Sequence, residues 1–170
     1  ALLLGCAGPQ VSDYAREQPS LELSDYFNGE LQAWGMFQNR SGEVVKRFHV
    51  AMTGTWNGDV GVLDERFTYS DGSTERRVWT LKKQADGSWR GTADDVVGEA
   101  IGHVAGNALN WRYQLRLKVD DSTYVVDFDD WMYLMDGQVM LNRARMSKWG
   151  IDLGQVTLSF YKPALVEGTQ

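Results

Sequence analysis

The sequence contains a single cysteine, Cys6, with only three prolines and two histidines among its 170 residues. One cysteine excludes an internal disulfide. Two isolated histidines, without a His-x-x-x-His or Cys-x-x-Cys spacing, predict no metal site. Beyond the amino terminus, no stretch approaches the ~20 apolar residues of a membrane-spanning helix. These scarcities exclude disulfide-stapled, metal-dependent and helical membrane folds.

Clustered positive charge is also missing, because the formal net charge is −6 and the only basic pairs are Arg76–Arg77 and Lys82–Lys83. Neighbours on a strand point to opposite faces, so neither pair forms a basic patch. We therefore expect no nucleic-acid partner. With 43% apolar, 12% aromatic and 24% charged residues, the composition is that of an ordinary globular protein, and the length predicts one domain.

Alternating apolar and polar residues fill the chain from Asn28 to Lys162, and short turn clusters interrupt them. Asn-Gly and Asp-Gly pairs supply the positive φ that tight hairpins require. The predicted turns are Asn39–Gly42, Asn57–Asp59, Ser70–Ser73, Ala85–Gly87, Val119–Asp121 and Met135–Gly137. About nine antiparallel strands result.

The clearest strand spans Asn107 to Lys118, where Leu109, Trp111 and Tyr113 alternate with polar residues. Sequential hairpins with one dry face favour a sheet that closes on itself. We predict an all-β fold, an antiparallel up-and-down β-barrel of eight to ten strands, over residues 20–163. Residues 164–170 are expected to be a C-terminal tail.

Several polar residues fall in phase with the apolar face of these strands. They are Glu65, Arg77, Asp95, Asn107, Asp130 and Asn142. Buried polar groups must pair or contact a ligand, and a small barrel can hold one small molecule. The small residues Gly91, Ala93, Gly98, Ala100, Gly102 and Gly106 are expected to leave space on one wall.

Four aromatic residues, Trp79, Trp111, Tyr113 and Phe128, would then supply flat apolar surfaces beside these polar groups. The guanidinium of Arg77 suits an acidic head group, because it can donate two parallel hydrogen bonds. The alternative is purely structural. In that case Glu65 pairs with Arg77, Asp130 and Asn142 bond the backbone, and the glycines permit strand coiling.

Catalysis has less support, and we assign no catalytic residue and no cofactor. His49 is out of phase with the dry face, His103 lies in a glycine-rich segment, and no nucleophile-elbow pattern occurs. A carboxylate-dependent hydrolase would instead have to use Glu65, Asp95 and Asp130.

A scaffolding role in the cell envelope is the third class of function that the sequence leaves open. Trp34, Trp131 and Trp149 would mark the partner surface if they are exposed, or would shield the barrel ends. The partner proteins are not identified.

The amino terminus, Leu2-Leu3-Leu4-Gly5-Cys6, resembles a bacterial lipobox. This resemblance implies that residues 1–5 are the remnant of a signal peptide and that Cys6 carries lipid. Residues 6–19 would form a polar tether. In enteric lipoproteins, an aspartate directly after the lipidated cysteine resembles an inner-membrane retention signal. This sequence has Ala7 at that position, so we expect an anchor in the outer membrane, on the periplasmic face. The alternative is an unmodified thiol in a frayed terminus.

The chain from Leu21 to Lys162 resembles an uncharacterised proteobacterial lipoprotein family, a domain of unknown function. The matching runs are Tyr26–Gly29, Ala33–Phe37, Asn39–Gly42, Tyr69–Gly72, Arg77–Trp79, Ala93–Gly98, Gly106–Trp111, Asp129–Tyr133 and Asn142–Ala144. Phe27, Gly29 and Trp34 are also similar to the first strand of lipocalin-type (calycin) barrels, although the Gly-to-Trp spacing is longer. These resemblances imply a lipid-anchored barrel and add no catalytic residue. From them and the candidate site we expect a lipid or another small amphipathic molecule as the partner.

Overall fold

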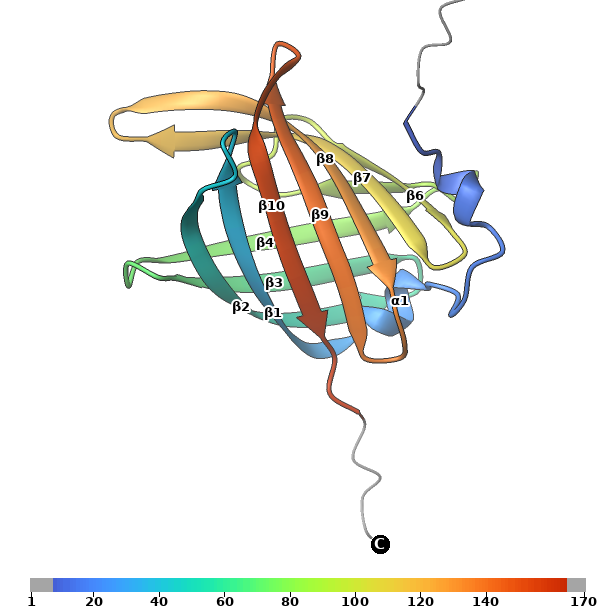
Figure 1. The fold of residues 1–170 in the computed structure, drawn as a ribbon. Coiled ribbons are helices and arrows are strands. Elements are labelled where there is room, and N and C mark those ends of the chain that lie inside the picture. Colours follow the sequence, from blue (N-terminus) through green and yellow to red (C-terminus); the bar gives the residue numbers. More distant parts are fainter. Residues whose placement is uncertain (1–7, 165–170) are drawn as a thin grey trace, which may run out of the picture.

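The computed structural model describes residues 8–164 and confirms the predicted fold. Within these residues the elements are η1 (Val11–Tyr14), α1 (Leu23–Tyr26), β1 (Gly29–Asn39), β2 (Val44–Asn57), β3 (Val60–Tyr69), β4 (Thr74–Lys83), β5 (Trp89–Thr92), β6 (Ala100–Ala105), β7 (Ala108–Val119), β8 (Ser122–Leu134), β9 (Val139–Lys148) and β10 (Ile151–Tyr161). The strands form one closed barrel in which each strand pairs antiparallel with its neighbours in sequence, and β1 closes the ring against β10 (Figure 1).

Three hairpin turns are stabilised by an aspartate that hydrogen-bonds the backbone two residues on. The carboxylates of Asp71, Asp86 and Asp136 accept the N–H of Ser73, Ser88 and Gln138, respectively. Such local bonds give the backbone an alternative to strand pairing and therefore end the strands. The positive φ predicted for the glycines of these turns is observed at Gly72 and Gly87 but not at Gly137.

One end of the barrel is closed by α1 and the residue that follows it. Leu23 and Phe27 are buried, at 2% and 4% exposure. The carbonyl of Phe27 accepts a 3.1 Å hydrogen bond from the indole N–H of Trp56, and a Cβ at Gly54 would lie 1.5 Å from the same oxygen. A glycine is therefore required where the chain crosses this end of the barrel.

The amino-terminal segment contacts the outside of the barrel near β6 and β7 (Figure 1). The ring of Tyr14, in η1, packs edge-on against Trp131 and Tyr133 of β8, with ring centroids 5.8 and 5.3 Å apart. The N–H of Leu21 then donates to the carbonyl of Gly106. This part of the predicted tether is therefore docked on the barrel, and Trp131 is half-buried rather than exposed.

The wall of the barrel is irregular where β5 and β6 are short. β4 pairs with β5 only from Thr80 to Lys83, and β7 pairs with β6 only from Ala108 to Arg112. The loop 93–99 fills part of the remaining gap between β4 and β7. A β-bridge joins Val96 to Leu115, and the backbone carbonyl of Asp95 accepts the N–H of Arg116. The loop makes this the least regular part of the wall.

Candidate functional site

The barrel encloses a cavity of about 1300 Å³, lined mainly by apolar side chains. At the α1 end the lining residues Leu23 and Phe27 are buried. At the other end, near the β1–β2 and β7–β8 hairpins, the lining residues Val45, Val119 and Tyr124 are 58%, 53% and 46% exposed. The cavity is therefore closed at one end and open at the end we call the mouth. The volume exceeds the roughly 300–1,000 Å³ of common small-molecule sites.

The four aromatic residues predicted for the site lie together on the cavity wall. Tyr113 and Phe128 stack in parallel, with centroids 5.0 Å apart. Trp79 meets Tyr113 and Trp111 edge-on, at 5.4 and 5.8 Å. Edge-on and stacked contacts are favourable beyond the area they bury. This cluster therefore gives the cavity a rigid apolar wall.

Two of the glycines, Gly91 and Gly102, do not leave the space that the sequence suggests. A Cβ at Gly91 would lie 2.4 Å from the ring of Trp111, and one at Gly102 would lie 2.2 Å from it. The indole of Trp111 therefore covers this part of the wall. At these positions the glycines serve packing, and the free volume of the barrel lies elsewhere.

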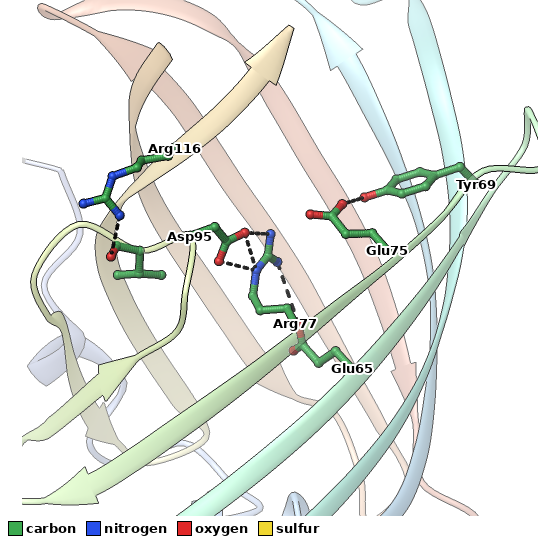
Figure 2. A network of polar contacts seen from close by, with 7 residues as sticks. Glu65, Tyr69, Glu75, Arg77, Asp95 and Arg116 are labelled. Atoms are coloured by element: carbon green, nitrogen blue, oxygen red, sulfur yellow. Dashed lines mark hydrogen bonds and ion pairs between the residues drawn. The ribbon is translucent and has the colours of Figure 1, made fainter. Parts of the chain in front are cut away.

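The predicted polar residues Arg77 and Asp95 form a two-pronged ion pair inside the barrel. The guanidinium of Arg77 donates from Nε and Nη2 to the carboxylate of Asp95, at 2.7–3.0 Å, and Glu65 lies 3.8 Å away on β3 (Figure 2). Burial alone would lower the pKa of Arg77, but Asp95 and Glu65 raise it above its ordinary value. The charge of Arg77 is thus already matched within the protein.

This arrangement contradicts the ligand expectation for Arg77, whereas the Glu65–Arg77 ion pair of the structural alternative is present at 3.8 Å. Arg77 is not free to hold an acidic head group, and its main partner is Asp95 rather than Glu65. Asp95 belongs to the loop 93–99, so the ion pair links β4 to the loop across the irregular part of the wall (Figure 2).

Glu65 is the second carboxyl group of this network. Burial raises its pKa to about 7, against the opposing charge of Arg77. Near neutral pH this side chain therefore retains a proton in a substantial part of the population, which lowers the net negative charge inside the cavity.

Asp130 and Asn142 form a second polar pair on the cavity wall. The amide of Asn142 donates to the carboxyl of Asp130 and to the backbone carbonyl of Trp131. Burial raises the pKa of Asp130 to about 7, and the hydrogen bond from Asn142 opposes this rise. The backbone bond that the structural alternative expects is present for Asn142, and Asp130 and Asn142 also bond each other.

Asn107 is the one predicted ligand residue that does not line the cavity. It lies in the turn between β6 and β7, and its amide donates to the carbonyl of Leu134. The alternation predicts an inward side chain because it assigns Asn107 to the strand, but the strand starts at Ala108. The other nine candidates all line the cavity.

The mouth carries cationic side chains that the sequence reasoning missed. Lys46 on β2, Lys118 on β7 and Lys148 on β9 line the open end of the cavity. Lys46 lies two residues from the inward-facing Phe48, and Lys148 lies two residues from the inward-facing Met146. The two-residue period of the strands could therefore have predicted both lysines.

Three of the candidate catalytic groups, His49, Asp95 and Asp130, are engaged in other contacts. The imidazole of His49 hydrogen-bonds Gln32 on the outer face of the barrel, beside Trp34. Asp95 and Asp130 are held by Arg77 and by the amide of Asn142, respectively.

Within residues 8–164, no cluster of three or more His, Cys, Asp or Glu side chains is arranged to hold a metal ion. No helix in this part of the chain is long and apolar enough to cross a membrane. Trp34 and Trp149 are 51% and 85% exposed, as the scaffold hypothesis requires of them.

No curated protein matches the chain. Among solved structures, the chain is similar to the S-type phycobiliprotein lyase CPES from Guillardia theta, with a TM-score of 0.60 and 8% identity over 92% of this chain and 99% of the lyase. At this identity the likeness shows a shared barrel fold. The model of a family of proteins of unknown function, DUF3833, matches residues 1–162. This chain therefore belongs to the DUF3833 family.

Proposed function

We propose that this protein binds or carries a small amphipathic or lipidic molecule, with the apolar part of the ligand inside the barrel. The observation that carries this proposal is the cavity, about 1300 Å³ in volume, open at one end and lined by the aromatic cluster of Trp79, Trp111, Tyr113 and Phe128. An apolar cavity of about 150 Å³ already binds benzene. Room for a much larger apolar group is therefore present.

The size of the driving force supports an acyl-like ligand. Each methylene removed from water contributes about 0.8 kcal/mol, so ten buried methylenes contribute roughly 8 kcal/mol. This gross gain matches the free energy of a micromolar complex, and the cost of association reduces it. The solved structure with the same fold is named a phycobiliprotein lyase, so this type of barrel also serves other functions.

The polar groups inside the cavity support an uncharged polar group on the ligand rather than a buried ion. The Arg77–Asp95 pair is internally matched, and burial favours the protonated forms of Glu65 and Asp130. Hydroxyl or carbonyl groups of a ligand can exchange hydrogen bonds with these carboxyls and with Asn142. The interior therefore suits a mainly apolar chain with a few neutral polar atoms.

A cavity-filling variant with a matched control tests the proposal. Ala144 is buried on the inner face of β9 and lines the cavity, whereas Ala51 is exposed on the outer face of β2. The uncharged fluorophore N-phenyl-1-naphthylamine should bind the unmodified protein and the Ala51→Phe variant equally. Ala144→Phe should reduce its affinity by about tenfold or more, since about 1.4 kcal/mol of lost apolar contact suffices. Val156→Phe, on the neighbouring strand β10, repeats the test if Ala144→Phe does not fold.

Binding that is unchanged in both filled variants would place the fluorophore outside the barrel and overturn the proposal. Absence of binding to the unmodified protein would do the same. Native mass spectrometry of protein purified from its source membrane would detect a natural ligand that purifies with it. Repeated purification without a small molecule would favour a purely structural barrel.

We further propose that the protein is a lipoprotein anchored by Cys6 in the outer membrane and facing the periplasm. The support is the lipobox-like sequence Leu2–Cys6, which lies outside the described residues. Metabolic labelling with a radioactive fatty acid should mark the full-length protein expressed with its own leader, and Cys6→Ser should abolish both the label and membrane association. Labelling that persists in Cys6→Ser would contradict this anchor.

A further inference from the structure

On the proposed function, charged residues along the cavity determine which end of the ligand faces the solvent. We infer that the mouth selects a single-chain amphiphile with an anionic head group, carboxylate or phosphate, and that Lys46, Lys118 and Lys148 hold the head. The apolar tail then lies against the aromatic cluster inside the barrel.

The orientation of two of these lysines follows from strand register. Lys46 lies two residues from Phe48 and Lys148 lies two residues from Met146, and all four line the cavity. Alternate residues of a strand share a face, so both lysine stems point inward at the mouth. A lysine stem can lie along an apolar wall while its ammonium group stays in water.

The lysine on β9 has no carboxylate within salt-bridge distance among the described residues. The ammonium group of Lys148 donates to the backbone carbonyl of Val125, at 2.9 Å, and lies 4.6 Å from the centroid of the Trp149 ring. Both partners are uncharged, so the positive charge of Lys148 remains available to an anion.

The acidic groups near the mouth are largely engaged in other hydrogen bonds. The carboxylate of Asp71 lies 3.7 Å from Lys46 but also accepts the N–H and hydroxyl of Ser73. Glu75 accepts a 2.7 Å hydrogen bond from the hydroxyl of Tyr69 (Figure 2).

Asp120 and Asp121 form the exposed tip of the β7–β8 hairpin, and neither lines the cavity. The acid that shares the mouth with the three lysines is therefore Glu75. The side chains that line the mouth are therefore net cationic, although Lys46 also pairs with Asp71 beside it.

The middle of the barrel opposes an anion. Asp95 saturates the guanidinium of Arg77, and Glu65 and Asp130 add two further carboxyl groups to the wall. An anionic head placed there would have to lose its water without a free cation to replace it. The charge pattern therefore fixes the polarity of the ligand, with the tail inside and the head at the mouth.

Displacement of bound N-phenyl-1-naphthylamine tests the inference with four ligands that share one chain: dodecanoate, dodecyl phosphate, dodecanol and dodecylamine. One charge-assisted contact corresponds to about a tenfold difference in affinity. We expect dodecanoate or dodecyl phosphate to displace the fluorophore at about tenfold lower concentration than dodecanol, and dodecylamine to be the weakest. The ranking of the two anions identifies carboxylate or phosphate as the preferred head. Raising the salt concentration should reduce the preference for anions, because the mouth is solvent-exposed.

The Lys46→Gln/Lys148→Gln variant should lose the preference for anions and keep its affinity for the fluorophore and for dodecanol. The charge-matched control, Lys82→Gln/Lys83→Gln, removes two lysines at the closed end of β4 and should keep the preference. Equal displacement by anion and alcohol in the unmodified protein would overturn this inference while the proposed function stands. A preference that survives in Lys46→Gln/Lys148→Gln would overturn it as well. Failure of the fluorophore to bind would instead remove the proposed function itself.

Discussion

The two buried carboxyls, Glu65 and Asp130, predict a stability that falls as the pH rises toward neutrality. Burial raises both pKa values to about 7, from ordinary values of 4.5 and 3.8. Between about pH 5 and pH 6.5 the folded protein keeps these protons and the unfolded chain loses them. The folded state then binds more protons, so the free energy of unfolding decreases with pH.

The slope follows from the number of such groups. Each carboxyl contributes about 1.4 kcal/mol per pH unit inside this window, so the pair contributes roughly 2.7 kcal/mol per unit. Hydrogen-bonded surface acids such as Asp64 and Asp71 have lowered pKa values, and they change protonation below the window. They therefore do not offset the slope.

Urea denaturation at several pH values, followed by tryptophan fluorescence, measures this slope. Asp130→Asn and Glu65→Gln should each reduce it by about 1.4 kcal/mol per pH unit, and the double variant should remove roughly 2.7 kcal/mol per unit. Asp71→Asn is the control and should leave the slope unchanged in this window, because the pKa of Asp71 is lowered. A slope that is the same in the unmodified protein and in both single variants would refute the buried, protonated state of these carboxyls.

Two further predictions concern the barrel wall. Arg77→Met should destabilise the protein by about 1–3 kcal/mol in chemical denaturation because it leaves the half-buried carboxylate of Asp95 without its partner, and a loss below about 0.5 kcal/mol would contradict the tight ion pair. Gly91→Ala should cost about 1–3 kcal/mol and lower the melting temperature because its Cβ meets the ring of Trp111, whereas Gly137→Ala, with open space around it, should be nearly neutral. Equal melting temperatures for the two alanine variants would show that Trp111 does not lie over Gly91.

Much of the fold could be predicted from the sequence because hairpin turns and two-residue alternation are local signals. The strand expected over Asn107–Lys118 is observed as Ala108–Val119, and the barrel closes with ten strands. The same alternation placed Glu65, Arg77 and Asp130 on the inner face correctly. At these three positions the strand continues through the residue, so the two-residue period was sufficient to place the side chain.

The remaining features depend on contacts between distant segments. The pairing of Arg77 with Asp95 requires the loop 93–99 to cross the wall, and no local pattern encodes that crossing. The filling of the glycine wall by Trp111 depends on cross-strand register. Trp131 is covered because Tyr14 docks from a segment that shows no periodicity in the sequence.

A crystal structure of the protein with 12-bromododecanoic acid tests the central claim most directly. The account predicts anomalous density from the bromine inside the barrel, near the cluster of Trp79, Trp111, Tyr113 and Phe128, with the carboxylate at the mouth. Bromine bound only on the outer surface, for example in the groove beside Trp34 and His49, would contradict the account, as would a barrel filled by its own side chains.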